Sequence, residues 1–292
     1  MKHLLSIALL FGLLLASPQA HAQDSTQQEL KILSWNIKML PFSFIKKRNH
    51  HTRARKIAKE LNKREYDIIV FQEAFRISSR KILKNKLRKK YPYIYGPARH
   101  WWNPTKTNSG IWVLSKTPLE ELATIAFEDC EGTDCLARKG ALLLEGNWKG
   151  NAFQVLGTHL DAGGPDKIRR NQFRELANKL LTKHQKEKVP QFICGDMNTA
   201  QSDRLYQEML SILQAEDIEL SENSDISFTS YNAKKQGKVI DYILLKKNKL
   251  KFSNLARSIR TIGEKWDLKN PVMVDTHRGL SDHLAVELIA EF

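Results

Sequence analysis

The stretch Gln191-Phe192-Ile193-Cys194-Gly195-Asp196-Met197-Asn198 is a short apolar run that ends in two polar side chains. Apolar runs of this length are typical of buried strands. An isolated buried carboxylate is costly, so Asp196 is expected to share its surroundings with other polar groups. The same pattern recurs at other predicted strand ends, where the polar residues are Asn36, Glu73, His159, Asp241, Asp282 and His283.

Short apolar runs alternate with stretches of helical periodicity along the rest of the chain. Besides 191–195, the runs predict strands over 30–37, 67–71, 109–115, 140–144, 153–159, 239–245 and 284–289. The spacing of apolar residues predicts helices over 52–62, 78–90, 165–184 and 203–213. Strands and helices follow one another from end to end without an internal repeat or a linker, which favours one α/β domain.

The composition is that of a globular and strongly basic protein. Its 292 residues are 41% hydrophobic and include three Cys, which excludes a disordered chain and a disulfide-dense scaffold. Lys and Arg number 47 against 32 Asp and Glu, so the formal net charge is +15. Basic clusters such as 46–48, 81–90 and 246–249 are solvated faces by default, but they could also attract nucleic acid or an anionic membrane.

Residues 1–22 have the pattern of a secretory signal peptide. A short basic start precedes an apolar run from Leu4 to Ala16, which is too short to span a bilayer. Ala20-His21-Ala22 then offers small residues where signal peptidase cleaves. The alternative is an N-terminal membrane anchor. Cleavage near Ala22 predicts a secreted or periplasmic domain of residues 23–292.

Export would permit disulfide formation. Cys130 and Cys135 flank a turn-like segment, Glu-Gly-Thr-Asp, and we expect them to form a disulfide. Cys194 lies within the apolar run 191–195 and is expected to be buried and inert, since nothing near it in sequence resembles a catalytic base.

The polar residues at the strand ends predict one shared site that binds a metal ion. Their oxygen ligands are carboxylates and amides, which suit a hard cation such as Mg²⁺ or Mn²⁺. The set contains two His and no Cys, which argues against a structural zinc site.

Taken in order, these motifs resemble those of the endonuclease/exonuclease/phosphatase superfamily. The matching segments, which run through nearly the whole chain, are Trp35-Asn36, Gln72-Glu73, Ser109-Gly110-Ile111, Gly157-Thr158-His159, Gly195-Asp196-Met197-Asn198, Ile240-Asp241-Tyr242 and Ser281-Asp282-His283. The resemblance implies a four-layer α/β sandwich, the DNase I-like fold, in which two packed β-sheets are flanked by helices. It also implies hydrolysis of a phosphoester with a divalent metal.

A narrower resemblance is to secreted bacterial sphingomyelinases, a phospholipase C-like branch. It rests on Met39-Leu40-Pro41, Glu73-Ala74-Phe75, Tyr91-Pro92-Tyr93, Cys130 to Cys135 before Lys139-Gly140, Leu160-Asp161-Ala162 and Ile168-Arg169-Arg170-Asn171-Gln172. Members of this branch often carry an aromatic-tipped hairpin before the final motif, for membrane contact. Here the segment 260–278 is short and has only Trp266.

The superfamily resemblance assigns metal binding to one group of residues. Glu73 matches the ligand of the essential cation, with Asn36 beside it. Asp282 is expected in the shell of the metal or of its water.

The same resemblance assigns catalysis to a second group. His283 matches the general base that takes a proton from water, and Asp241 matches the acid that orients it. His159 and Asn198 match groups that hold the phosphoryl oxygens. Asp196 is expected to position the attacking water or to protonate the leaving oxygen.

These matches predict a secreted phosphodiesterase that converts sphingomyelin to ceramide and phosphocholine. The alternatives are an exported Mg²⁺-dependent nuclease, favoured by the charge, and a catalytically inactive binding module.

The adjacent Trp101 and Trp102 are candidates for membrane contact, although they could also stack on bases or pack in a loop. The expected partner is a phospholipid or a membrane surface. We expect a monomer without an obligate protein partner.

Overall fold

The computed structural model describes residues 29–41, 49–98, 107–231, 236–263 and 280–292. The predicted signal peptide and the predicted membrane-contact pair, Trp101 and Trp102, lie outside these ranges. Within them, no helix has both the length and the apolar character that a membrane span requires.

Two six-stranded sheets form the centre of the molecule. The first has the order β13-β14-β1-β2-β4-β3. Its strands are β1 (Glu29–Asn36), β2 (Ile68–Gln72), β3 (Tyr93–Tyr95), β4 (Trp112–Ser115), β13 (Asn254–Arg260) and β14 (Ala285–Glu291). In this sheet β1 and β2 are parallel, so their carboxyl ends lie at the same edge.

The second sheet has the order β5-β6-β7-β8-β12-β9. Its strands are β5 (Leu119–Ala126), β6 (Gly140–Trp148), β7 (Asn151–His159), β8 (Gln191–Asp196), β9 (Ala215–Asp217) and β12 (Asp241–Lys246). Here β7 and β8 are parallel, whereas β12 runs antiparallel to β8. A separate ribbon pairs β10 (Ser230–Tyr231) with β11 (Gly237–Lys238).

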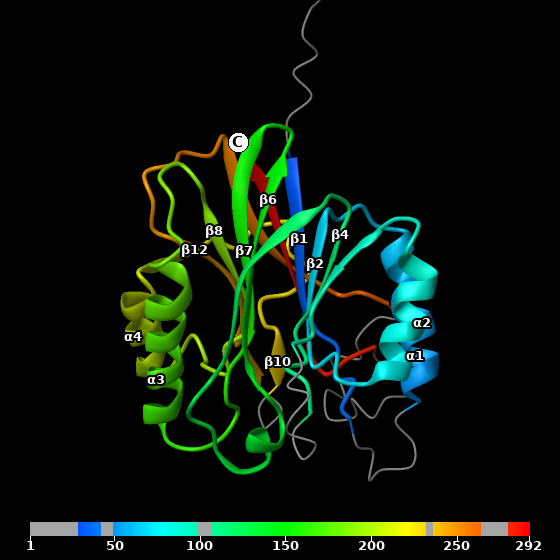
Figure 1. Ribbon diagram of the computed structural model, residues 1–292, viewed down its shortest axis with the longest axis horizontal. Coiled ribbons are helices and arrows are strands. Elements are labelled where there is room, and N and C mark those ends of the chain that lie inside the picture. Colours follow the sequence, from blue (N-terminus) through cyan, green and yellow to red (C-terminus); the bar gives the residue numbers. More distant parts are fainter. Residues whose placement is uncertain (1–28, 42–48, 99–106, 232–235, 264–279) are drawn as a thin grey trace, which may run out of the picture.

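Helices cover the outer face of each sheet (Figure 1). The first sheet is covered by α1 (His50–Asn62) and α2 (Ile77–Leu87). The second is covered by α3 (Asp166–Glu175), its π-helical continuation η2 (Leu176–Leu181) and α4 (Arg204–Leu213). A short 3-10 helix, η1 (Gly132–Leu136), precedes β6. The predicted four-layer α/β sandwich is confirmed.

Three apolar layers follow from this arrangement. Between the sheets lie buried residues such as Ile32, Val70, Val155, Phe192 and Val286. A second layer joins the first sheet to its helices, and a third joins the second sheet to α3 and α4. The middle layer is apolar along the strands, so polar side chains gather only where the strands end.

Several local features differ from the predicted ones. The predicted helix 165–184 is α-helical only to Glu175 and continues as a π-helix. Asp241 is the first residue of β12, whereas the apolar pattern places it inside a strand. Lys246 belongs to a predicted solvated cluster, yet it is buried and donates a hydrogen bond from Nζ to Gln214 Oε1 at 2.9 Å.

Candidate active site

The inward face of β8 carries Phe192, Cys194 and Asp196. Side chains two residues apart point to the same side of a strand. Phe192 and Cys194 belong to the apolar layer between the sheets, so Asp196 continues their row toward the strand end. The alternation that buries the core therefore also directs this carboxylate between the two sheets.

The neighbouring strands repeat this arrangement. In β1 the row through Leu30 and Ile32 reaches Asn36, and in β7 the row through Phe153 and Val155 reaches His159. Position 157 of the β7 row is glycine because a Cβ there would lie 2.8 Å from Val70 Cγ1 of the facing sheet.

Strand register brings the polar ends together. Asp196 is aligned with His159 of β7 on one side and with Asp241 of β12 on the other. Asn36 spans the two sheets, because its Nδ2 donates to Asp196 Oδ2 at 3.0 Å. Lys38 fixes the orientation of this amide by donating its backbone N–H to Asn36 Oδ1 at 3.1 Å.

Glu73 follows β2 and faces Asn36. Its Oε1 accepts a hydrogen bond from Asn36 Nδ2 at 3.2 Å, while its buried Oε2 has no partner among the described residues. Burial, followed by the negative charge of Asp282, raises the pKa of Glu73 above its ordinary value. The backbone of Glu73 has a φ of 52°, a conformation that costs free energy for a residue other than glycine and is found at functional sites.

His283 and Asp241 form a buried pair. Nδ1 of His283 lies 2.9 Å from Asp241 Oδ2, and Asp196 Oδ2 lies farther away at 3.8 Å. Burial favours the neutral imidazole, but the charges of Asp241 and Asp196 outweigh it and raise the pKa of His283 well above its ordinary value. Burial and then the charge of Asp241 raise the pKa of Asp196 to about 6.

The segment before β14 holds His283 in place. Trp35 Nε1 donates to the backbone carbonyl of His283 at 3.0 Å, and Ser281 Oγ donates to the carbonyl of Asn36 at 2.5 Å. Arg53 of α1 donates to the carbonyls of Leu280 and Ile37. These contacts join the end of β1 to the segment that carries His283.

His159 contacts a buried lysine. Lys139 is only 6% exposed, and its Nζ lies 3.1 Å from His159 Nε2. Asp196 Oδ2 lies farther from Nε2, at 3.5 Å. Because a lysine ammonium can only donate, the closer contact assigns Nε2 as the acceptor and the hydrogen of the neutral imidazole to Nδ1. That Nδ1 is buried and has no partner among the described residues. Burial and then the charge of Lys139 lower the pKa of His159 well below its ordinary value, which keeps the ring neutral.

Asn198 and Asp282 are the last two of the predicted metal and catalytic residues. Asn198 donates its backbone N–H to Asp196 Oδ1 at 3.0 Å and its Nδ2 to the carbonyl of Leu160 at 2.9 Å. Asp282 forms an ion pair with Lys38. Burial opposes ionisation of Asp282, but the positive charges of His283 and Lys38 prevail and lower its pKa.

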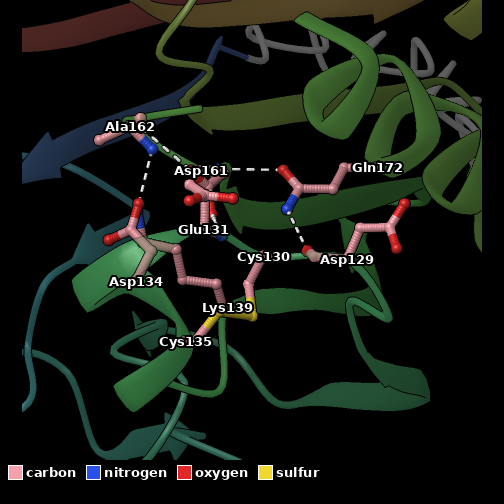
Figure 2. Close-up of a disulfide and its surroundings, with 10 residues drawn as sticks. Asp129, Cys130, Glu131, Asp134, Cys135, Lys139, Asp161, Ala162 and Gln172 are labelled. Atoms are coloured by element: carbon pink, nitrogen blue, oxygen red, sulfur yellow. Dashed lines mark hydrogen bonds and ion pairs between the residues drawn. A yellow bond between two sulfur atoms is a disulfide. The ribbon is translucent and has the colours of Figure 1, made fainter. Parts of the chain in front are cut away.

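The disulfide loop lies beside the end of β7 (Figure 2). Cys130 and Cys135 are bonded, as predicted, and Cys194 is a buried free thiol. From within the loop, Asp134 accepts hydrogen bonds from Lys139 Nζ at 3.0 Å and from the backbone N–H of Ala162 at 2.6 Å. The loop thus anchors the lysine that contacts His159.

The structure brings all eight predicted metal and catalytic residues to one end of the sandwich. Sequence reasoning missed Lys38 and Lys139, which touch residues of this set. It also missed Arg53, which binds the neighbouring backbone carbonyls of Ile37 and Leu280. Lys139 stands in the quoted segment Lys139-Gly140, but a lysine is ordinarily solvated, and only the fold shows that this one is buried.

Two groups of these residues have the chemistry to bind a metal. Asp196, Asp241 and His283 offer ligand atoms that all lie within 4.8 Å of one another. In that group, however, His283 Nδ1 is already hydrogen-bonded to Asp241. Glu73 instead offers a buried carboxylate oxygen without a partner, which fits a hard divalent cation with Asn36 and Asp282 close by.

Known proteins of similar sequence include a sphingomyelinase C and a phospholipase C. Sphingomyelinase C 2 of Leptospira interrogans is 34% identical over 212 residues, which make up 65% of this chain and 34% of the relative. Phospholipase C of Staphylococcus aureus is 24% identical over 307 residues, with 96% of this chain and 92% of the relative covered. The chain spans between 34% and 43% of the length of the three Leptospira relatives it matches.

A solved structure confirms the fold. A double mutant of beta toxin from Staphylococcus aureus, crystallised with bound magnesium ions, superposes with a TM-score of 0.74 at 24% identity. The match covers 90% of this chain and all of the toxin chain. The sequence profile of the Endonuclease/Exonuclease/phosphatase family matches residues 33–283, a range that contains every polar strand end described above. The chain is therefore a member of the endonuclease/exonuclease/phosphatase family.

Proposed function

We propose that the chain is a secreted, divalent-metal-dependent phosphodiesterase of the sphingomyelinase C type, which hydrolyses sphingomyelin to ceramide and phosphocholine. One observation carries the proposal. A buried His283–Asp241 pair and the unpartnered oxygen of Glu73 lie at the same end of the sandwich, with Asn36 and Asp196 between them. This combination supplies a base and a metal ligand in one water-poor site.

His283 acts as the general base in its neutral form, so it must first release the proton that its raised pKa favours. Its Nδ1 is occupied by Asp241, so its other ring nitrogen takes the proton from the attacking water. Asp241 orients the ring and stabilises the imidazolium that forms. Oxygen of that water bonds to phosphorus as the bond from phosphorus to the ceramide oxygen breaks.

Charge on the phosphoryl oxygens is balanced by neutral donors. Nδ1 of His159 has no partner among the described residues, so with the hydrogen assigned to it by the contact of Nε2 with Lys139 it can donate to one of these oxygens. Asn198 keeps one amide hydrogen for the same purpose, since only one bond from its Nδ2 is used by Leu160. Asp196, whose pKa is raised to about 6, can orient the water or deliver a proton to the leaving oxygen.

Glu73 would hold a divalent cation, with Asn36 and Asp282 beside it. When bound, Mg²⁺ or Mn²⁺ would withdraw negative charge from the phosphate and so stabilise the transition state. Export is supported by the signal-peptide pattern of residues 1–22. The lipid substrate is supported by the likeness to sphingomyelinase C and phospholipase C.

The formal net charge of +15 favours a second candidate, an exported nuclease. A direct comparison of substrates separates the two. The purified mature protein is offered sphingomyelin in mixed detergent micelles, phosphatidylcholine in the same micelles and duplex DNA, each with Mg²⁺ or with EDTA. We expect phosphocholine release from sphingomyelin with Mg²⁺ and none with EDTA. Faster cleavage of DNA than of either lipid, or full activity in EDTA, would overturn the proposal.

A further inference from the structure

The outer face of α1 and α2 is strongly cationic. The two helices contain eight Lys and Arg residues and one acidic residue, Glu60. Two of the cations, Arg53 and Arg80, turn toward backbone carbonyls. The exposed cations of the helices and of the residues that follow them are Arg55, Lys56, Lys59, Lys63, Lys81, Lys84, Lys86, Arg88 and Lys89.

These side chains form one continuous surface. Ile77, Lys81, Lys84 and Arg88 follow the spacing of one helical face, and all four are exposed. The two helices lie side by side on the first sheet, and Asn62 Nδ2 at the end of α1 donates to the carbonyl of Lys86 at 3.3 Å (Figure 1). We call the exposed side chains of this face the α1–α2 surface.

Three cations in line on the α1–α2 surface are not neutralised by ion pairs within the described part of the chain. Lys81, Lys84 and Arg88 form no ion pair with any described residue, whereas Glu60 pairs only with Lys63 and Arg64 at the end of α1. The helices on the other sheet differ. There several cations are paired with acids, as in Arg169–Asp166, Arg170–Glu208 and Lys179–Glu175. A stronger positive potential is therefore expected over α1 and α2 than over the opposite helical layer.

Among the large apolar side chains of the described residues, the most exposed one also lies on the α1–α2 surface. Ile77 is 60% exposed and lies at the start of α2, in line with Lys81 and Lys84. An aliphatic side chain beside lysines suits a lipid surface, where the aliphatic group enters the headgroup region and the ammonium groups meet lipid phosphates. A nucleic-acid backbone is charged and offers no apolar environment that would bury this isoleucine.

We propose that the α1–α2 surface binds anionic phospholipid membranes. α2 begins four residues after Glu73, so the Ile77 end of this surface is connected to the candidate active site by a short segment. None of the surface residues belongs to that site. The inference therefore goes beyond the proposed function, and either can fail without the other.

The test compares two variants of equal net charge. Lys81→Gln, Lys84→Gln and Arg88→Gln together remove three charges from the α1–α2 surface. Lys167→Gln, Arg174→Gln and Lys183→Gln remove three exposed charges from the opposite helical layer. Binding is measured by sedimentation with vesicles of phosphatidylcholine, with and without phosphatidylserine, without added divalent cation. Hydrolysis of a soluble phosphodiester by the same proteins reports on the active site.

We expect the α1–α2 triple variant to lose binding to phosphatidylserine vesicles roughly 100-fold at low salt, since each cation contributes about fivefold. The control triple variant should lose far less, and both should keep wild-type hydrolysis of the soluble substrate. Ile77→Ser should weaken vesicle binding but not DNA binding. Equal losses in the two triple variants would show a general effect of net charge and overturn the proposal. Tighter binding to duplex DNA than to the vesicles, lost in the same triple variant, would assign the surface to nucleic acid and also overturn it.

Discussion

Along the inward-facing side of a strand, the middle buries apolar side chains, whereas the end at the candidate site buries polar ones. In β8 the row passes from Phe192 through Cys194 to Asp196, and all three are buried. The apolar middle stabilises the sandwich, whereas a buried carboxylate costs stability and needs partners such as Asn36. The same strand alternation produces both regions, so a register slip of one residue would displace the core and the site together. Changes at the site end should therefore affect activity, and changes in the middle should affect folding.

His283→Ala tests the site end and has the largest expected effect. We expect turnover of sphingomyelin to fall about 10²- to 10⁴-fold, because the variant lacks the base for the attacking water. Far-ultraviolet circular dichroism should remain that of the wild type. His184→Ala is the matched control, since His184 lies at the end of the α3 layer, away from the residues of the site. Near wild-type turnover of the His283 variant would refute the assigned role.

Phe192→Ala tests the middle of the same β8 row. Phe192 is fully buried between the sheets, so we expect the free energy of unfolding to fall by about 3–5 kcal/mol. The folded fraction should keep its activity, because Asp196 remains four residues away. Denaturant titration measures the first quantity, and turnover per folded molecule measures the second. If the fully folded variant lost turnover, the middle of the row would affect activity directly, which contradicts the expectation that it affects only folding.

Asp196→Asn tests the site end of the β8 row through the pH dependence of stability. The folded pKa of Asp196, about 6, lies above the unfolded value of about 4, so its proton stabilises the folded state. That contribution is complete below the unfolded pKa and is lost as pH rises through 6. Asparagine does not titrate, so the variant should gain stability relative to the wild type between pH 4 and pH 7, by about 1–3 kcal/mol. Turnover should nevertheless decrease.

The measurement is chemical denaturation of both proteins across this pH range, without divalent cation. A difference in stability that stays constant with pH would show that Asp196 is not destabilised by its surroundings.

The sequence predicts the polar site well because its residues are tied to strand ends. Asn36, His159, Asp196 and His283 each close or precede an apolar run, and parallel strands bring such ends to one edge. The hydrogen bond from Asn36 to Asp196 cannot be predicted from the sequence, because it depends on how the two sheets pack.

Other features depend on tertiary contacts, so the pattern of apolar residues in the sequence does not predict them. β13 is flanked and interrupted by polar residues and exists through its pairing with β14. Lys139 has the composition of a surface residue, but the carbonyl of Leu160 and the carboxylate of Asp134 solvate its ammonium group inside the protein. Neither long-range partner can be inferred from local sequence.

We propose that the polar strand ends form one metal-dependent site with Glu73 as the ligand. Calorimetric titration of Mg²⁺ into the wild type and into Glu73→Gln, without substrate, tests it most directly. We expect saturable binding by the wild type and at least about tenfold weaker binding by the folded variant, because the amide lacks the carboxylate charge that a hard cation prefers. Equal Mg²⁺ affinity in the two proteins would contradict the claim.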